Sequence, residues 1–246
     1  MRMHKEYKRI VNHATKAILF IHGIIGTPDH FHFLLPLVPE NISIHNLLLD
    51  GHGKGVREFS KTSIKKWEAQ VALAVEDLAK QHQEIYIVAH SLGSLLAIEQ
   101  AIKNEKVTKL FLLAVPLQVS VKPRMLRNTM RVYFDKIDPN DEELVAAKRC
   151  CGVVQSKNLL LYLGWIPRYL ELFAKIRQIR SQVALLKTPC LACQSAKDEM
   201  VSPRAIRILE TNPTIAVMEL KNSGHCYYEK SDLARLQDAF ADFLFT

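Results

Sequence analysis

The chain has 246 residues, 48% of them hydrophobic and 24% charged, with a formal net charge of +8. This length suits one soluble domain, or one domain with an insertion. No uncharged apolar run approaches the ~20 residues of a membrane span, and five cysteines, two of them adjacent, argue against a disulfide framework. We therefore expect a cytoplasmic protein without stable membrane insertion.

Short apolar runs bounded by turn residues predict the strands of a sheet. They cover residues 17–22, 43–49, 85–90, 107–115, 190–195 and 214–220, with a weak edge strand at 6–11. Helical periodicity separates them, at residues 63–82, 91–104, 202–210 and 231–245. This alternation predicts an α/β fold with a mostly parallel, doubly wound sheet. Such sheets bind ligands beyond the carboxyl ends of their strands.

The alternation stops after Pro116 and resumes at Pro189. Residues 117–186 show helical patterns, so we predict a helical lid there, inserted between late strands of a core formed by residues 1–116 and 187–246. The apolar segment 158–167 would line a pocket or form the lid's own small core. Its candidate substrate-binding residues are Leu159, Leu163, Trp165 and Ile166.

The positive charge is concentrated in the same part of the chain. Residues 117–187 contain 13 Lys and Arg against 6 Asp and Glu, whereas the rest of the chain is nearly balanced. The ordinary interpretation is that these charges cover the solvated faces of helices, and the alternative is attraction to an anionic substrate or a lipid surface. We expect no nucleic-acid partner, because no nucleic-acid-binding motif accompanies the charge. The oligomeric state is not readable from the sequence.

Residues 87–96, IVAHSLGSLL, place Ser91 between a predicted strand and a predicted helix. A serine at this position can be a helix N-cap or a nucleophile in a G-x-S-x-G elbow, where small flanking residues let the backbone turn sharply. Ala89 replaces the first glycine of that motif, and Gly93 keeps the second. The stretch by itself leaves both interpretations open.

Further polar residues follow other predicted strands and suggest a catalytic group. A serine hydroxyl is a poor nucleophile near neutral pH and needs an adjacent base, which His225 can supply. Either Asp198 or its neighbour Glu199 can orient the imidazole. Acyl transfer also needs donors for the developing oxyanion. The amide of Leu92 follows the serine, and the loop after His22 and Gly23 offers a second donor, most simply the amide of Ile24.

The chain resembles the α/β-hydrolase superfamily, and within it the small carboxylesterases and monoacylglycerol lipases. The resemblance rests on five stretches in the family's order: LFIHGIIGTP, DGHGKG, IVAHSLGS, SAKDEMVSP and NSGHCYYEK. It implies Ser91 as nucleophile, Asp198 as triad acid, His225 as base, and the amides of Ile24 and Leu92 as oxyanion hole. It further implies hydrolysis of carboxylic esters through an acyl-enzyme, without metal or cofactor.

The expected substrate is a small-molecule ester, anionic or lipid-like, with a short- to medium-chain acyl group, such as a monoacylglycerol. Thioesterases and acyltransferases share the triad and differ in the acceptor, so both remain alternatives. A binding protein on a hydrolase fold with an idle triad is a third alternative, since fold alone does not determine function.

Other histidines of the strand-end loops are expected to be structural. His22 and His52 would bond to loop backbone. His90 precedes Ser91 and would point away from it, because neighbours on a strand alternate faces. It would then shape the site and would not act as a second base.

No metal site is expected. His30 and His32 form an H-x-H pattern without a third ligand in the sequence, and the Cys190–Cys193 CxxC pair lies in a predicted buried strand. Cys226 directly follows the candidate base, and a buried thiol there would behave as a small hydrophobe.

Overall fold

The strands form one sheet in a computed structural model that describes residues 4–134 and 136–245. They are β1 (Tyr7–Arg9), β2 (Lys16–Ile21), β3 (Ser43–Leu47), β4 (Glu84–His90), β5 (Val107–Leu113), β6 (Cys190–Ser195) and β7 (Ile215–Leu220). Their order across the sheet is β1-β3-β2-β4-β5-β6-β7. The short edge strand β1 is antiparallel to β3, and the other neighbouring strands are parallel. The predicted fold class is confirmed.

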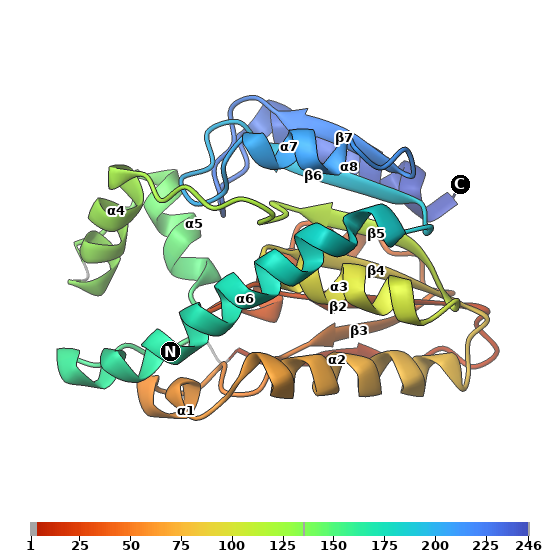
Figure 1. The fold of residues 1–246 in the computed structure, drawn as a ribbon, viewed down its shortest axis with the longest axis horizontal. Coiled ribbons are helices and arrows are strands. Elements are labelled where there is room, and N and C mark those ends of the chain that lie inside the picture. Colours follow the sequence, from red (N-terminus) through yellow and green to blue (C-terminus); the bar gives the residue numbers. More distant parts are fainter. Residues whose placement is uncertain (1–3, 135, 246) are drawn as a thin grey trace.

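Helices cover both faces of this sheet, with α2, α3 and α6 on one face and α8 on the other (Figure 1). The α-helices are α1 (Val56–Ser60), α2 (Ile64–Ala79), α3 (Leu92–Lys103), α4 (Pro123–Tyr133), α5 (Glu142–Cys150), α6 (Ile166–Gln182), α7 (Arg204–Leu209) and α8 (Lys230–Phe245). Short 3₁₀ helices are η1 (Pro28–Phe31), η2 (Leu35–Leu37), η3 (Leu159–Trp165) and η4 (Val183–Leu185). Among the described residues, no helix has the length and apolar character required to cross a bilayer.

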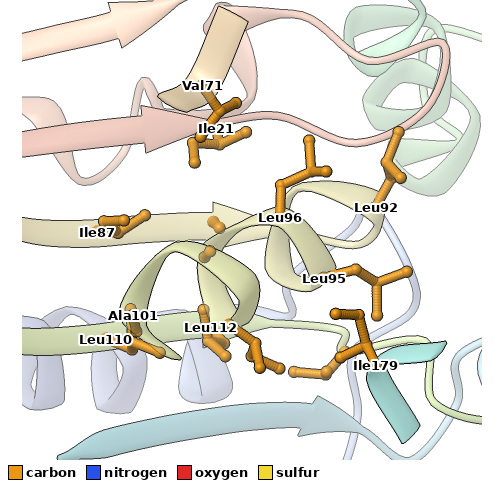
Figure 2. Close-up of a cluster of buried hydrophobic side chains, with 14 of the residues drawn as sticks. Ile21, Val71, Ile87, Leu92, Leu95, Leu96, Ala101, Leu110, Leu112 and Ile179 are labelled. Atoms are coloured by element: carbon orange, nitrogen blue, oxygen red, sulfur yellow. The ribbon is translucent and has the colours of Figure 1, made fainter. Parts of the chain in front are cut away.

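The two faces of each central strand contribute to different parts of the core. Along β2, Leu19 and Ile21 pack with α2, α3 and α6, whereas Ile18 and Phe20 pack with η1 and α8. Strands buried on both faces consist of continuous apolar runs, and for this reason they could be predicted from the sequence. Figure 2 shows Leu95 of α3 beside Ile179 of α6, whereas Leu96 of the same helix points toward Ile21 of β2.

The inserted segment is helical, as predicted, and its helices lie in two places. α4 and α5 lie at the carboxyl end of the sheet, and α6 runs from there back along α3 (Figure 1). Ile176 and Ile179 of α6, and Val183 at the start of η4, are buried in the same core cluster as α3, so the second half of α6 packs as part of the helical layer. The division of the chain into a core (residues 1–116 and 187–246) and a lid (residues 117–186) remains a prediction. Residues 1–3, 135 and 246 of these segments lie outside the described residues.

Candidate active site

Ser91 occupies a sharp turn between β4 and α3. Its backbone angles are φ 52° and ψ −121°, in a region that residues other than glycine seldom adopt. The turn is fixed on both sides, because the Ser91 amide donates to Leu113 O at 2.9 Å and its carbonyl accepts from Ser94 N at 2.9 Å. This is the geometry of a nucleophile elbow, and no side-chain cap bond occupies the Ser91 hydroxyl.

Small residues around the elbow permit a close approach of three segments. A Cβ atom on Gly93 would lie 2.2 Å from the carbonyl oxygen of Ile21 at the end of β2. A Cβ atom on Gly23 would lie 3.0 Å from Cβ of Ser91. Ala89, the departure from the G-x-S-x-G pattern, is fully buried in β4 and retains regular pairing with β2 and β5. The extra methyl group is therefore accommodated within the sheet.

Asp198 and His225 form a buried hydrogen-bonded pair. They follow the neighbouring parallel strands β6 and β7, whose last residues Ser195 and Leu220 are in register. Nδ1 of His225 donates to Oδ2 of Asp198 at 2.8 Å. The other carboxylate oxygen, Oδ1, accepts from the amides of Met200 and Val201, both at 2.7 Å. The acid is thereby held by its own loop in one orientation toward the imidazole.

Each member of this pair favours the charged form of the other. Burial lowers the pKa of His225, but the adjacent Asp198 carboxylate outweighs burial and raises it to about 9. Burial raises the pKa of Asp198, and the imidazole together with the two loop amides brings it below its ordinary value. Asp198 is therefore ionised at neutral pH, and it stabilises the protonated form of His225.

Glu199 contacts the same histidine at a different atom. Its Oε2 accepts from the backbone amide of His225 at 3.1 Å and lies 3.7 Å from the Arg124 guanidinium of α4. The structure thus places Asp198 on the imidazole and Glu199 on the main chain. Residue types by themselves leave both acids open for the orienting role, whereas the family resemblance implies Asp198.

His90 joins the strand before the elbow to the histidine loop. Its Nε2 donates to the carbonyl oxygen of His225 at 2.9 Å, and the two ring centroids are 4.7 Å apart. Burial and the nearby His225 lower the pKa of His90 to about 3, so its ring is neutral. In the described residues the Ser91 hydroxyl has no hydrogen bond to His225, and the hydrogen bond of His90 connects the end of β4 to the histidine loop.

The loop after β2 carries the other predicted oxyanion donor. Gly26 N donates to Gly23 O at 2.9 Å, which closes a tight turn around Ile24. Within the described residues the amides of Ile24 and Leu92 donate to no backbone carbonyl, and Leu92 is the first residue of α3, where first-turn amides lack helical partners. The segment after α5 covers this loop, because Gly152 N donates to Ile25 O at 2.7 Å.

The residues predicted to bind substrate are exposed or pack on α1. Leu159, Leu163 and Ile166 are 65%, 61% and 52% exposed. Trp165 packs its ring against Phe59 of α1 at 4.8 Å and donates Nε1–H to Val56 O. The segment therefore packs on α1 and leaves most of its leucines on the surface.

His22 and His52 bond to loop backbone, as expected from the sequence. His22 Nε2 accepts from Leu49 N at 3.1 Å, and His52 Nδ1 donates to Leu49 O at 3.1 Å. Burial lowers the pKa of both imidazoles, so each is neutral. They stabilise the loops beside the site.

A second polar cluster lies beside the histidine loop and was not visible in the sequence. It consists of His30 from η1, Cys150 from the end of α5 and Cys226, and its ligand atoms all lie within 4.8 Å of one another. The sequence could not bring it together, because Cys150 belongs to the insertion and is 120 positions from His30. By contrast, Cys190 and Cys193 are buried in β6, as predicted, and burial raises the pKa of both thiols.

Comparisons with known proteins agree with this geometry. A family model for the alpha/beta hydrolase family matches residues 18–239. No curated protein sequence matches the chain significantly.

Solved structures with the same fold include several lipolytic enzymes. One comes from work on LipS and LipT, two metagenome-derived lipolytic enzymes. It has a TM-score of 0.75 and 16% sequence identity, and the match covers 99% of this chain and 98% of that chain. Another is a monoacylglycerol lipase from Paleococcus ferrophilus, with a TM-score of 0.70 and 16% identity over 98% of each chain. A third is Est1E from Butyrivibrio proteoclasticus with bound ferulic acid, with a TM-score of 0.65 and 18% identity over 98% of this chain and 94% of that chain. With most of its length matched by the family model and its fold shared with these enzymes, the chain belongs to the alpha/beta hydrolase family.

Proposed function

We propose that the protein is a serine hydrolase that cleaves carboxylic esters, with Ser91, Asp198 and His225 as its triad. The observation that carries this proposal is the buried hydrogen bond of 2.8 Å between His225 Nδ1 and Asp198 Oδ2, at the same edge of the sheet as a serine in a strained strand-to-helix turn. The acid fixes Nδ1 of the histidine, so Nε2 is free to exchange a proton with substrate and nucleophile.

In the proposed reaction, Oγ of Ser91 attacks the ester carbonyl carbon while Nε2 of His225 takes its proton. The oxyanion of the tetrahedral intermediate accepts hydrogen bonds from the amides of Ile24 and Leu92. The C–O bond breaks, and His225 gives the proton to the leaving alcohol. Water then attacks the acyl-enzyme, His225 takes one water proton and returns it to Ser91, and the carboxylic acid leaves.

We further propose that the inserted helices act as a lid over this site. Tyr227, two residues after the base, donates its hydroxyl to Glu142 of α5 at 2.7 Å. Arg124 of α4 donates to Lys197 O at 2.9 Å, next to the triad acid. These contacts tie α4 and α5 to the two catalytic loops.

The proposed substrates are esters with short- to medium-chain acyl groups, including monoacylglycerols. Structures that share the fold include a monoacylglycerol lipase and lipolytic enzymes, and this likeness supports the proposed substrate class.

A series of p-nitrophenyl esters from acetate to palmitate tests this proposal. We expect kcat/KM to be highest between acetate and octanoate, and Ser91→Ala to lower kcat by roughly 10⁴-fold or more. Matched coenzyme A thioesters provide the comparison. Turnover of thioesters alone, or a maximum at palmitate, would contradict the proposed substrate class.

A further inference from the structure

His30, Cys150 and Cys226 form a compact group of soft ligands outside the proposed triad. Nδ1 of His30 lies 3.1 Å from Sγ of Cys150, and Cys150 Sγ lies 4.0 Å from the carbonyl oxygen of Cys226. The cysteines are free and partly buried, and the imidazole is almost fully buried. The nitrogen and both sulfur atoms all lie within 4.8 Å of one another.

We propose that these three side chains bind a zinc ion. Zn–S bonds of about 2.3 Å and Zn–N bonds of about 2.0 Å place tetrahedral ligand atoms roughly 3.5 to 4 Å apart. The observed spacing of 3.1 to 4.8 Å brackets that range, so small rotations of the side chains would close the site. Two thiolates and an imidazole bind zinc in preference to hard cations such as magnesium and calcium.

The surroundings provide access to the ion and an orientation for the imidazole. A cavity of about 250 Å³ opens beside the cluster and includes all three side chains in its lining. A water molecule from this cavity would complete the coordination. Nε2 of His30, the nitrogen away from Cys150, lies 3.5 Å from the Tyr228 hydroxyl. Such an outer partner fixes the tautomer in which Nδ1 faces the metal.

The position of the site connects three segments around the proposed base. His30 comes from η1, Cys150 ends α5, and Cys226 follows His225 in the chain. The His30 ring also packs on the His90 ring in a tilted arrangement, with centroids 3.9 Å apart, and His90 donates to the carbonyl oxygen of His225. An ion at this point would restrain the histidine loop and hold α5 against it.

Metal binding by untagged protein, reduced with a phosphine, tests the site directly. Cobalt(II) serves as the spectroscopic probe for zinc, because thiolate ligands give it a charge-transfer absorption in the near ultraviolet. We expect one cobalt ion per chain with this band, displaced by zinc. Cys150→Ser and Cys226→Ser should each lose the band and weaken zinc binding roughly 100-fold or more, since each removes a ligand, not merely an outer partner.

Cys151→Ser is the matched control, because it makes the same change one residue further along. The Cys151 thiol donates to Val153 O at 3.6 Å, and it does not belong to the cluster. We expect Cys151→Ser to bind cobalt and zinc like the wild type. A wild-type cobalt complex without the charge-transfer band would overturn the site, and so would a band that persists in both Cys150→Ser and Cys226→Ser.

A second arm measures ester turnover and rests on the proposed function. Zinc should lower turnover several-fold in the wild type and in Cys151→Ser, reversibly with a chelator, and should leave Cys150→Ser unaffected. Equal inhibition of Cys150→Ser would contradict the link to the histidine loop. Because the cobalt spectrum needs no substrate, an absence of esterase activity would leave the binding test unchanged.

Discussion

At the scale of single residues, His225 is held at three atoms by three different groups. Asp198 accepts from Nδ1, Glu199 accepts from the backbone amide, and His90 donates to the carbonyl. Nε2 is the atom that these contacts leave for proton transfer. The arrangement makes the imidazole more basic, because the ionised Asp198 favours its protonated form.

The raised pKa of His225 predicts an alkaline pH profile. The base must be neutral to take the Ser91 proton, so kcat/KM should be lost as pH falls below its pKa and rise as pH approaches about 9. Asp198→Asn should lower this apparent pKa and reduce kcat by roughly 10⁴-fold. The measurement is kcat/KM against pH, with Ser91→Ala as the blank for alkaline hydrolysis. A profile already level at neutral pH would contradict the raised pKa.

Residue types alone supplied the candidates for this site, the family resemblance selected Asp198 and His225 among them, and the contacts between the side chains come from the structure. Ser91, Asp198 and His225 each follow an apolar strand, and parallel strands end at one edge of a sheet. The choice between Asp198 and Glu199 depends on which carboxylate faces the imidazole, and the path of the loop determines that. The upward shift of the His225 pKa likewise depends on burial and distance, whereas an unperturbed histidine has a pKa near ~6.5.

At the scale of elements, the junction of β4 and α3 positions both the proposed nucleophile and one proposed oxyanion donor. α3 begins directly at Leu92, so its first turn passes the end of β2 at the distance that Gly93 permits. Because Gly93 carries no side chain, the helix can approach the sheet closely there. The approach sets where the Leu92 amide lies relative to Ser91.

Gly93→Ala should therefore disrupt both stability and activity. Its Cβ atom would lie 2.2 Å from Ile21 O and 2.8 Å from His22 O, which are backbone atoms that cannot rotate away. We expect the free energy of unfolding in urea to fall by about 1–3 kcal/mol and ester turnover to fall strongly. Gly55→Ala is the control, since its Cβ would meet only the flexible Glu58 side chain. Equal, small effects for both variants would contradict this account of the elbow.

Periodicity located the longer elements better than the short ones. The apolar face of α2, with Trp67, Val71, Val75 and Leu78 buried, follows the pattern seen in the sequence. The five-residue helix α1 and the 3₁₀ helices were not predicted, because so few residues show no period. The packing of the second half of α6 against the core was also not predicted, because the same apolar pattern is expected for a helix that packs in a lid and for one that packs on a sheet.

At the scale of the whole molecule, the sheet order brings distant parts of the chain together at one edge. β4, β5, β6 and β7 are successive neighbours, so Ser91, Asp198 and His225 gather although 134 positions separate the first from the last. This gathering could be predicted from the strand order of a parallel fold. The cluster of His30, Cys150 and Cys226 could not, because it depends on how the insertion packs over the edge.

The central claim is that Ser91 is the nucleophile, and a fluorophosphonate probe tests it most directly. The probe reacts with an activated serine hydroxyl and displaces fluoride, and mass spectrometry of the digested protein then locates the phosphonate. We predict a single adduct on Ser91 in the folded wild type, and none in Ser91→Ala or in the denatured chain. An adduct on another residue, or equal labelling of wild type and Ser91→Ala, would contradict the account.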